Sequence, residues 1–225
     1  MTDDAQDNAG TDPDQLPSDP QIAKSAKLGK NAAVEDQASL EDRAKVKKKA
    51  VVSGNARVSS KAKVTGNARV SGRAWVHGQS LVTGDAAISG HAEVSGNAQI
   101  SGNAQVSGRA EVDGNAVITD DAWVFDDALV SGNARVGGQV AVFGDAQINK
   151  KADLGGRAAV ANGARIDDPA HVVSQLDETT GIVWTVYRVK KNKAAAMRDR
   201  DPVDLADVPD ELWRRAVKGW KAKGR

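Results

Sequence analysis

The chain contains no cysteine, which excludes disulfide bonds, thiolate metal sites and a cysteine nucleophile. Aromatic residues are scarce, at 4% of the sequence, and the apolar residues are mostly small, so we do not expect the wide core of a two-layer globular domain. No apolar run approaches the roughly 20 residues of a membrane span, and the acidic start MTDDAQDNAG excludes a secretory signal. These absences predict a soluble cytoplasmic protein with a thin, long core.

A six-residue repeat fills most of the chain. Counting back from Val172 in steps of six, every position down to Leu28 is Val, Ile or Leu, and the residue two positions earlier is almost always Ala. Roughly 25 hexads, such as AKVTGN, ARVSGR and AQISGN, follow one another without insertion, which is typical of a solenoid. Alternation along an extended strand places the aliphatic residue and the Ala on one face. Each hexad is therefore predicted to contribute one short strand with an apolar inner side.

The residues after each strand predict sharp corners. A Gly-Asn or Gly-Asp pair follows many aliphatic positions, as at Gly66-Asn67 and Gly84-Asp85. Glycine adopts positive φ freely and Asn or Asp tolerates it, so the chain can turn every six residues. Three corners close a triangle of about 18 residues, and about eight coils would stack into a rod about 40 Å long. We therefore predict an all-β fold, a triangular solenoid whose coils pair as parallel strands.

The repeat, an aliphatic residue preceded two positions earlier by a small one, resembles the hexapeptide-repeat left-handed parallel β-helix family over about two thirds of the chain. The NARVSG style, with the strand-rich TGIVWTVYR near the end, is similar to bacterial and prophage solenoids that are often labelled acyltransferases. Left-handed coils are implied by this resemblance alone. It also implies, for the enzymes of the family, a His base and a trimer with acyl-CoA sites between subunits.

Composition divides the chain into five segments. Residues 1–21 are rich in Asp and Pro and are predicted to be a disordered acidic leader, followed by the β-helix at 22–172. Residues 173–190 are predicted to form a strand hairpin that caps the last coil, and 191–208 a linker. Residues 209–225 are predicted to form a short basic amphipathic helix. Its apolar stripe for tail packing contains Leu212, Trp213, Val217 and Trp220.

Three histidines are the weak candidates for a catalytic base: His77 on a flat strand, His91 at a corner and His171 beside the cap. No carboxylate is evident beside any of them and no inserted loop builds a cleft, although a base must be held in geometry. We therefore favour a non-catalytic solenoid scaffold or protein-interaction module without a cofactor. The alternative is an acyltransferase of the hexapeptide class, acting with acyl-CoA at a trimer interface.

Two successive hexads replace the Gly-Asn corner by Asp-Asp, at Asp120-Asp121 and Asp126-Asp127. Hard cations prefer such oxygen ligands. The two pairs nevertheless fall on corners at opposite ends of one strand. We expect solvated turns here rather than a metal site.

Sorting the outward positions by a period of about 18 residues gathers apolar side chains on one side of the C-terminal coils. The expected interaction face consists of Trp123, Phe125, Ala141, Phe143, Ala159 and Ala161. Exposed apolar patches commonly mark an interface. We expect the chain's own C-terminal helix or another copy of the chain to cover this face, with an external protein as a third alternative. Trp75 falls on a different side and is interpreted as an isolated exposed aromatic residue.

The charge of the chain limits its partners. The net charge is +1, so the chain as a whole does not attract nucleic acid or membranes. The segment after Arg188 is basic, and nucleic acid is therefore a third, weaker hypothesis. We interpret the aromatic residues of that segment as packing residues. We expect no membrane partner and disfavour nucleic acid.

Overall fold

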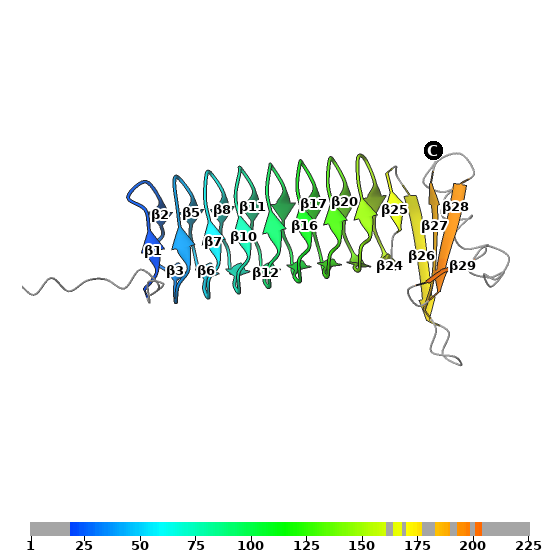
Figure 1. The fold of residues 1–225 in the computed structure, drawn as a ribbon, viewed down its shortest axis with the longest axis horizontal. Coiled ribbons are helices and arrows are strands. Elements are labelled where there is room, and N and C mark those ends of the chain that lie inside the picture. The colour runs from blue at the N-terminus through cyan, green and yellow to red at the C-terminus, as the bar shows by residue number, and fades with distance from the viewer. Residues whose placement is uncertain are drawn as a thin grey trace, which may run out of the picture.

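The structure, a computed structural model, describes residues 19–160 and 164–167 and four further strands between residues 170 and 203 (Figure 1). Its main body is a rod of stacked coils, each with three short strands and three corners. The predicted triangular parallel solenoid is confirmed. Within the described part of the chain, no helix is long and apolar enough to cross a membrane.

Three parallel sheets form the sides of the rod. Sheet A contains β1 (Gln21–Ile22), β4 (Ser39–Leu40), β7 (Arg57–Val58), β10 (Trp75–Val76), β13 (Glu93–Val94), β16 (Glu111–Val112), β19 (Leu129–Val130), β22 (Gln147–Ile148) and β25 (Arg165–Ile166). Sheet B contains β2 (Lys27–Leu28), β5 (Lys45–Val46), β8 (Lys63–Val64), β11 (Leu81–Val82), β14 (Gln99–Ile100), β17 (Val117–Ile118), β20 (Arg135–Val136) and β23 (Asp153–Leu154). Sheet C contains β3 (Ala33–Val34), β6 (Val51–Val52), β9 (Arg69–Val70), β12 (Ala87–Ile88), β15 (Gln105–Val106), β18 (Trp123–Val124), β21 (Gln139–Val142) and β24 (Arg157–Val160).

Strands of consecutive coils pair in a constant register. Trp75 lies beside Glu93 in sheet A, Leu81 beside Gln99 in sheet B, and Ala87 beside Gln105 in sheet C. Backbone hydrogen bonds join each coil to the next, as where the Arg57 amide donates to the Ala74 carbonyl oxygen at 2.9 Å. A side chain therefore lies beside the residue 18 positions later, as Asn97 lies beside Asn115. Outward residues consequently form columns along the rod.

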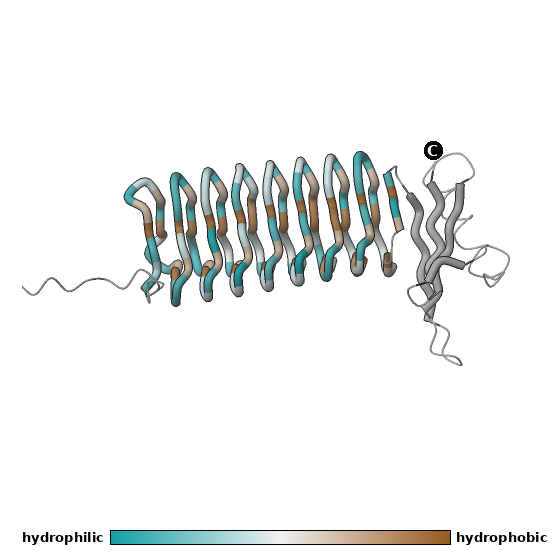
Figure 2. Tube along the Cα trace, in the orientation of Figure 1, coloured by the Kyte–Doolittle hydropathy of each residue, from teal (hydrophilic) through white to brown (hydrophobic). Residues whose placement is uncertain are grey.

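The core is the line of inward aliphatic and Ala residues. Every aliphatic position from Leu40 to Ile166 is almost fully buried, and in the hydropathy colouring these apolar positions recur coil after coil (Figure 2). Ser80 and Val140 replace Ala at two inward positions and are buried as well. The Ser80 hydroxyl donates to the carbonyl oxygen of His77 at 2.7 Å, so this buried polar group has a partner.

Glycine corners allow the coils to stack closely. Gly96 has φ of 62°, and a Cβ atom on it would lie 2.7 Å from the carbonyl oxygen of Gly114 in the next coil. Asparagine side chains next to these glycines form ladders along the rod. The Asn97 amide donates to Asn115 at 3.0 Å, and Asn115 donates to Asn133 at 3.0 Å.

A fourth, antiparallel sheet follows the coils. It contains β26 (Ala170–Leu176), β27 (Val183–Val189), β28 (Lys193–Arg198) and β29 (Asp201–Val203), in that order. Strand β26 contacts β23 and β24, and the sheet lies beyond the last coil (Figure 1).

The sequence-based boundaries near this sheet need two corrections. Val172 ends the hexad count, but it lies in β26 and pairs with Tyr187 of β27, so the parallel coils end at β25. The composition of residues 191–208 predicts a linker, yet β28 and β29 lie there, because β27 offers a second edge for pairing. The expected leader, apart from its last residues, and the expected helix at 209–225 fall outside the described residues.

Candidate functional site

The N-terminal half of sheet A carries a cluster of polar and aromatic side chains, which we call the sheet A cluster. It consists of Glu41, Arg57, Ser59, Trp75, His77 and Glu93. Strands β7, β10 and β13 place Arg57, Trp75 and Glu93 in one outward column. The other three members occupy the next outward position of the hexad, one residue after a buried aliphatic.

His77 is the histidine that this arrangement holds in place. Its Nε2 atom lies 2.9 Å from a carboxylate oxygen of Glu93, and its ring stacks on Trp75 with centroids 4.0 Å apart. The Trp75 indole donates to the Ser59 hydroxyl at 3.1 Å, and the Arg57 guanidinium lies 5.5 Å from the indole centroid. Two sequence interpretations are therefore wrong: His77 has a carboxylate partner, and Trp75 is not isolated.

The missed contacts share one spacing. A separation of 16 residues in the sequence is common to all three contacts, which join Glu41 to Arg57, Ser59 to Trp75 and His77 to Glu93. This is a diagonal contact between the outward position after a strand and the strand residue of the following coil. Sorting the sequence by the coil period identifies side chains that share one column, but it does not identify contacts between two adjacent columns. A long polar residue repeated at this offset is the signal that could have identified the cluster.

An ion pair ends the cluster on the N-terminal side. The Arg57 guanidinium donates to both carboxylate oxygens of Glu41, at 3.2 and 3.1 Å. The hydrogen bond from Arg57 lowers the pKa of Glu41 below its usual value of 4.5, although partial burial opposes the shift. Ser39 adds a further donor to Glu41 at 2.8 Å. The pair stabilises the ionised carboxylate.

We expect Glu41→Gln to remove a small, pH-dependent contribution to the free energy of unfolding. Because the folded pKa is lowered, the pair stabilises the fold above the usual pKa of 4.5, and this contribution fades as the pH falls below it. For so exposed a pair the loss should be below about 1 kcal/mol near neutral pH. Denaturant unfolding across the acid range measures it, with Glu111→Gln of β16 as the control. A variant whose deficit persists in acid would contradict this assignment.

The cluster offers limited chemistry. Glu93 can orient the His77 ring, and if Nε2 donates, Nδ1 is left as the proton acceptor. Such a dyad is half of a general-base arrangement. His91 lies exposed at the corner between β12 and β13, two residues before Glu93. His171 lies in β26, opposite Arg188 of β27. The structure therefore does not bring the three histidines to one strand or corner.

The Asp-Asp corners are positioned by backbone contacts. Asp120 and Asp126 adopt φ of 60° and 58°, in the region that glycine occupies at other corners. Their carboxylates accept the backbone amides of Gly138, at 2.8 Å, and Gly144, at 3.3 Å, in the following coil. Asp121 accepts the Asn103 amide at 2.9 Å, and Asp127 is exposed beside Asp126. These contacts show how Asp120 and Asp126 are accommodated at positions where other corners have Gly.

Among the described residues, no group of three or more Asp, Glu or His side chains is placed to hold a metal ion. The two Asp-Asp pairs follow β17 of sheet B and β18 of sheet C, so they occupy different corners of the rod.

The apolar residues of the C-terminal coils gather on sheet C. Trp123 lies beside Ala141, and Ala141 beside Ala159, on β18, β21 and β24. Phe125 contacts Trp123, with centroids 4.4 Å apart, and stacks on Phe143 at 4.9 Å with an angle of 6° between the rings. Trp123 is 45% exposed. We call this set the sheet C aromatic face; its expected sixth member, Ala161, lies outside the described residues.

The tail residues expected to pack on this face, namely Leu212, Trp213, Val217 and Trp220, also lie outside the described residues. No protein-family model matches the sequence, and a search of curated proteins finds no match.

Proposed function

We propose that the chain is a non-catalytic solenoid rod of the cytoplasm whose sheet C aromatic face is a protein-contact surface. The observation that carries the proposal is the stacked row of Trp123, Phe125 and Phe143 on the C-terminal coils of sheet C. Earlier coils carry Arg69, Ala87 and Gln105 in the same column. Ring stacking fixes these side chains in advance, so little conformational entropy is lost when a partner covers them.

The occupant that we assign to this face is the C-terminal segment of the same chain. Residues 212, 213, 216, 217 and 220 are apolar, a spacing that places them on one side of a helix. The described chain ends at Val203 in β29, and the sheet to which β29 belongs contacts β24 of the aromatic face. The 22 residues from 204 to 225 are long enough to reach the aromatic face from there.

We expect Trp123→Ser and Trp220→Ala to increase protease cleavage of the tail to the same extent. Each change removes one side of the same contact, so the double variant should be no more sensitive than either single variant. Limited proteolysis followed by intact mass measures the cleavage. The matched control is Trp75→Ser, which alters an exposed tryptophan on sheet A and should leave the tail unchanged. Equal cleavage of wild type and both tryptophan variants would contradict the assignment.

The molar mass in solution distinguishes docking within one chain from exchange between chains. A monomer that keeps its mass in the Trp123→Ser variant indicates docking within the chain. An oligomer that dissociates in this variant indicates that the segment of one copy covers the face of another. An oligomer that is unaffected by both Trp123→Ser and Trp220→Ala would show that the C-terminal segment does not contact the sheet C aromatic face.

The alternative function is that of a hexapeptide-class acyltransferase, and the His77–Glu93 contact favours it. The resemblance supplies the expectation of a His base, and the 2.9 Å contact supplies an orienting carboxylate. Acyl-CoA would then bind between subunits of a trimer. The test is calorimetric titration of acetyl-CoA into the full chain: a trimer that binds it, and that loses acyl transfer in His77→Ala, would replace the non-catalytic proposal.

A further inference from the structure

Sheet B carries a concentration of positive charge at the N-terminal end of the rod. Lys27 lies beside Lys45, and Lys45 beside Lys63, on the paired strands β2, β5 and β8. The corners on both sides of these strands add further cations. The whole set, which we call the lysine face, is Lys24, Lys27, Lys30, Arg43, Lys45, Lys47, Lys48, Lys49, Lys61 and Lys63.

The lysine face is exposed and scarcely neutralised. All its side chains except the half-buried Lys45 are exposed. Asp42 is the one acidic residue in the three stacked segments 24–31, 42–49 and 60–67. Its carboxylate accepts the Ser60 amide at 3.0 Å rather than pairing with a lysine. The ion pairs found among the described residues involve Arg57, His77, Lys150 and Arg165, which belong to other parts of the rod.

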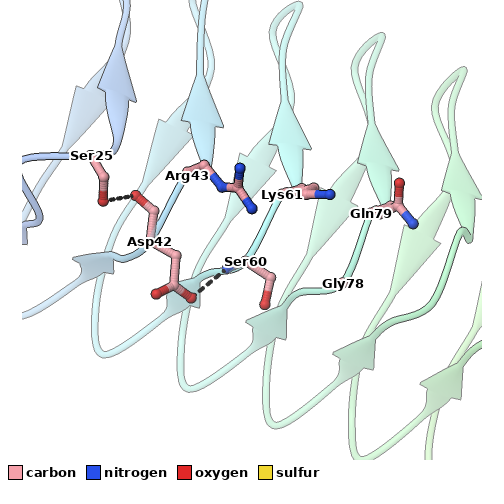
Figure 3. Close-up of a pocket in the computed structure, with 7 residues that line it drawn as sticks. All are labelled: Ser25, Asp42, Arg43, Ser60, Lys61, Gly78 and Gln79. Atoms are coloured by element: carbon pink, nitrogen blue, oxygen red, sulfur yellow. Dashed lines mark hydrogen bonds between the residues drawn. The ribbon is translucent and has the colours of Figure 1, made fainter.

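A shallow groove follows one corner of this face. Its volume is about 580 Å³, and it crosses successive coils at the corner between sheets A and B. Ser25, Arg43, Lys61 and Gln79 line it in a row, one from each coil, and Asp42, Ser60 and Gly78 form its other side (Figure 3). Ser25 and Ser60 both contact Asp42, through its carbonyl and carboxylate oxygens respectively. Apart from the Asp42 carboxylate, the groove therefore presents cations and amide or hydroxyl donors in a row along the rod.

The continuous run of cations on this side of the rod ends with these coils. In the next coil the corresponding segment 78–85 contains Gln79, Leu81 and Asp85 and no cation. A column of lysines at the strand spacing of about 4.8 Å is self-repelling, and an array of phosphates would relieve that repulsion. This periodicity indicates a partner with many regularly spaced anions rather than one small anion.

We propose that the lysine face binds duplex nucleic acid through the phosphate backbone, without reading the base sequence. The outward positions within the segments 24–31, 42–49 and 60–67 contain no aliphatic or aromatic side chain that could stack bases or insert into a bilayer. The cations cover a flat side and both adjoining corners, a convex surface. A planar membrane would contact one side only, whereas the two phosphate strands that border a groove can contact both corners.

The near-neutral net charge of the chain does not reveal the lysine face. Binding of nucleic acid to the lysine face does not depend on the sheet C aromatic face. Phosphate binding through lysines is governed by counterion release, so affinity falls steeply as salt rises. Each lost phosphate contact should reduce the slope of log affinity against log salt by about 0.9. The slope of log affinity against log salt therefore measures the number of phosphate contacts. Its change in a variant distinguishes the lysine face from cations elsewhere in the chain.

The test compares two full-length triple variants by fluorescence anisotropy with a labelled DNA duplex of mixed sequence. One is Lys27→Gln with Lys45→Gln and Lys63→Gln. The control, which also removes three exposed cations but from the sheet C side, is Arg69→Gln with Arg73→Gln and Arg109→Gln. We expect the lysine variant to reduce the salt slope by up to about 2.7 and to weaken binding at about 50 mM salt by tenfold or more. The arginine variant should bind almost as wild type does.

Three results would overturn the proposal. Equal weakening by both variants would show binding by general charge or by another segment. Binding to phosphatidylserine vesicles without binding to duplex would assign the face to a membrane surface. In the third result, the wild type fails to bind duplex while a variant with Asp3, Asp4, Asp7, Asp12 and Asp14 changed to Asn binds it. That result would assign the lysine face to the chain's own acidic leader. Unchanged circular dichroism in both variants confirms that they fold.

Discussion

Val106→Asp is expected to unfold the middle of the rod. Val106 is fully buried in β15, where it packs in the line of inward residues between Ile88 and Val124 of the neighbouring coils. A carboxylate there would have no described partner and no access to water, a cost that exceeds about 4 kcal/mol. Each coil is stabilised by its neighbours, so the loss should spread along the array. Thermal unfolding followed by far-UV circular dichroism measures it.

The control for this prediction lies one residue away. Gln105→Asp places the same side chain at the outward position of the same strand, where Gln105 is exposed. It should shift the melting temperature by far less, since surface changes alter stability by about 0.5 kcal/mol. An unchanged transition in Val106→Asp would contradict the observed alternation between inward and outward positions.

Gly96→Val is expected to produce the second large loss. The valine would have to adopt φ near 62°, which β-branched residues almost never do. Its Cβ would also lie 2.7 and 2.8 Å from the carbonyl oxygen and amide nitrogen of Gly114, which are backbone atoms of the next coil. Strain and displacement together should reduce the free energy of unfolding by about 2 to 4 kcal/mol. Urea denaturation measures the change.

Gly155→Val is the matched control, because a Cβ on Gly155 meets no atom within 4 Å and its φ is not in the left-handed region. Gly96→Asp provides a further comparison. Aspartate occupies the corresponding positions 120 and 126, where its carboxylate accepts an amide of the next coil. Gly96→Asp should therefore be less destabilising than Gly96→Val. If Gly155→Val were the more harmful valine substitution, close stacking at the corners would not be the reason for glycine.

The hexad pattern predicts the coils well because one physical requirement recurs in every unit. Burial of residues such as Val58 and Ile100 in a prism of fixed width permits only small aliphatic residues, so the pattern is unambiguous. The columns of sheet C follow directly, and Trp123, Ala141 and Ala159 lie where the period places them. Left-handedness of the coils stays a prediction from the family resemblance.

The remaining features depend on side-chain reach and on pairing at the end of the array, which the period does not encode. His77 reaches Glu93 because long side chains cross diagonally to the next coil. Val172 keeps the hexad spacing, but antiparallel pairing with β27 determines its place. The net charge of +1 does not reveal the lysine face, because it sums these cations with acidic residues in other parts of the chain.

Because the register of the coils is constant, the position of a residue in the sequence determines its angle about the rod axis as well as its place along that axis. Sheet membership is set by position in a cycle of three hexads, so the lysine face on sheet B and the aromatic face on sheet C keep a fixed rotation about the long axis. Removal of one whole coil would bring the two faces closer by about 4.8 Å without turning either. Removal of a single hexad would instead rotate every later column by one side of the triangle. Changes in the length of this protein by whole coils therefore preserve the relative orientation of its two faces, whereas changes by one or two hexads do not.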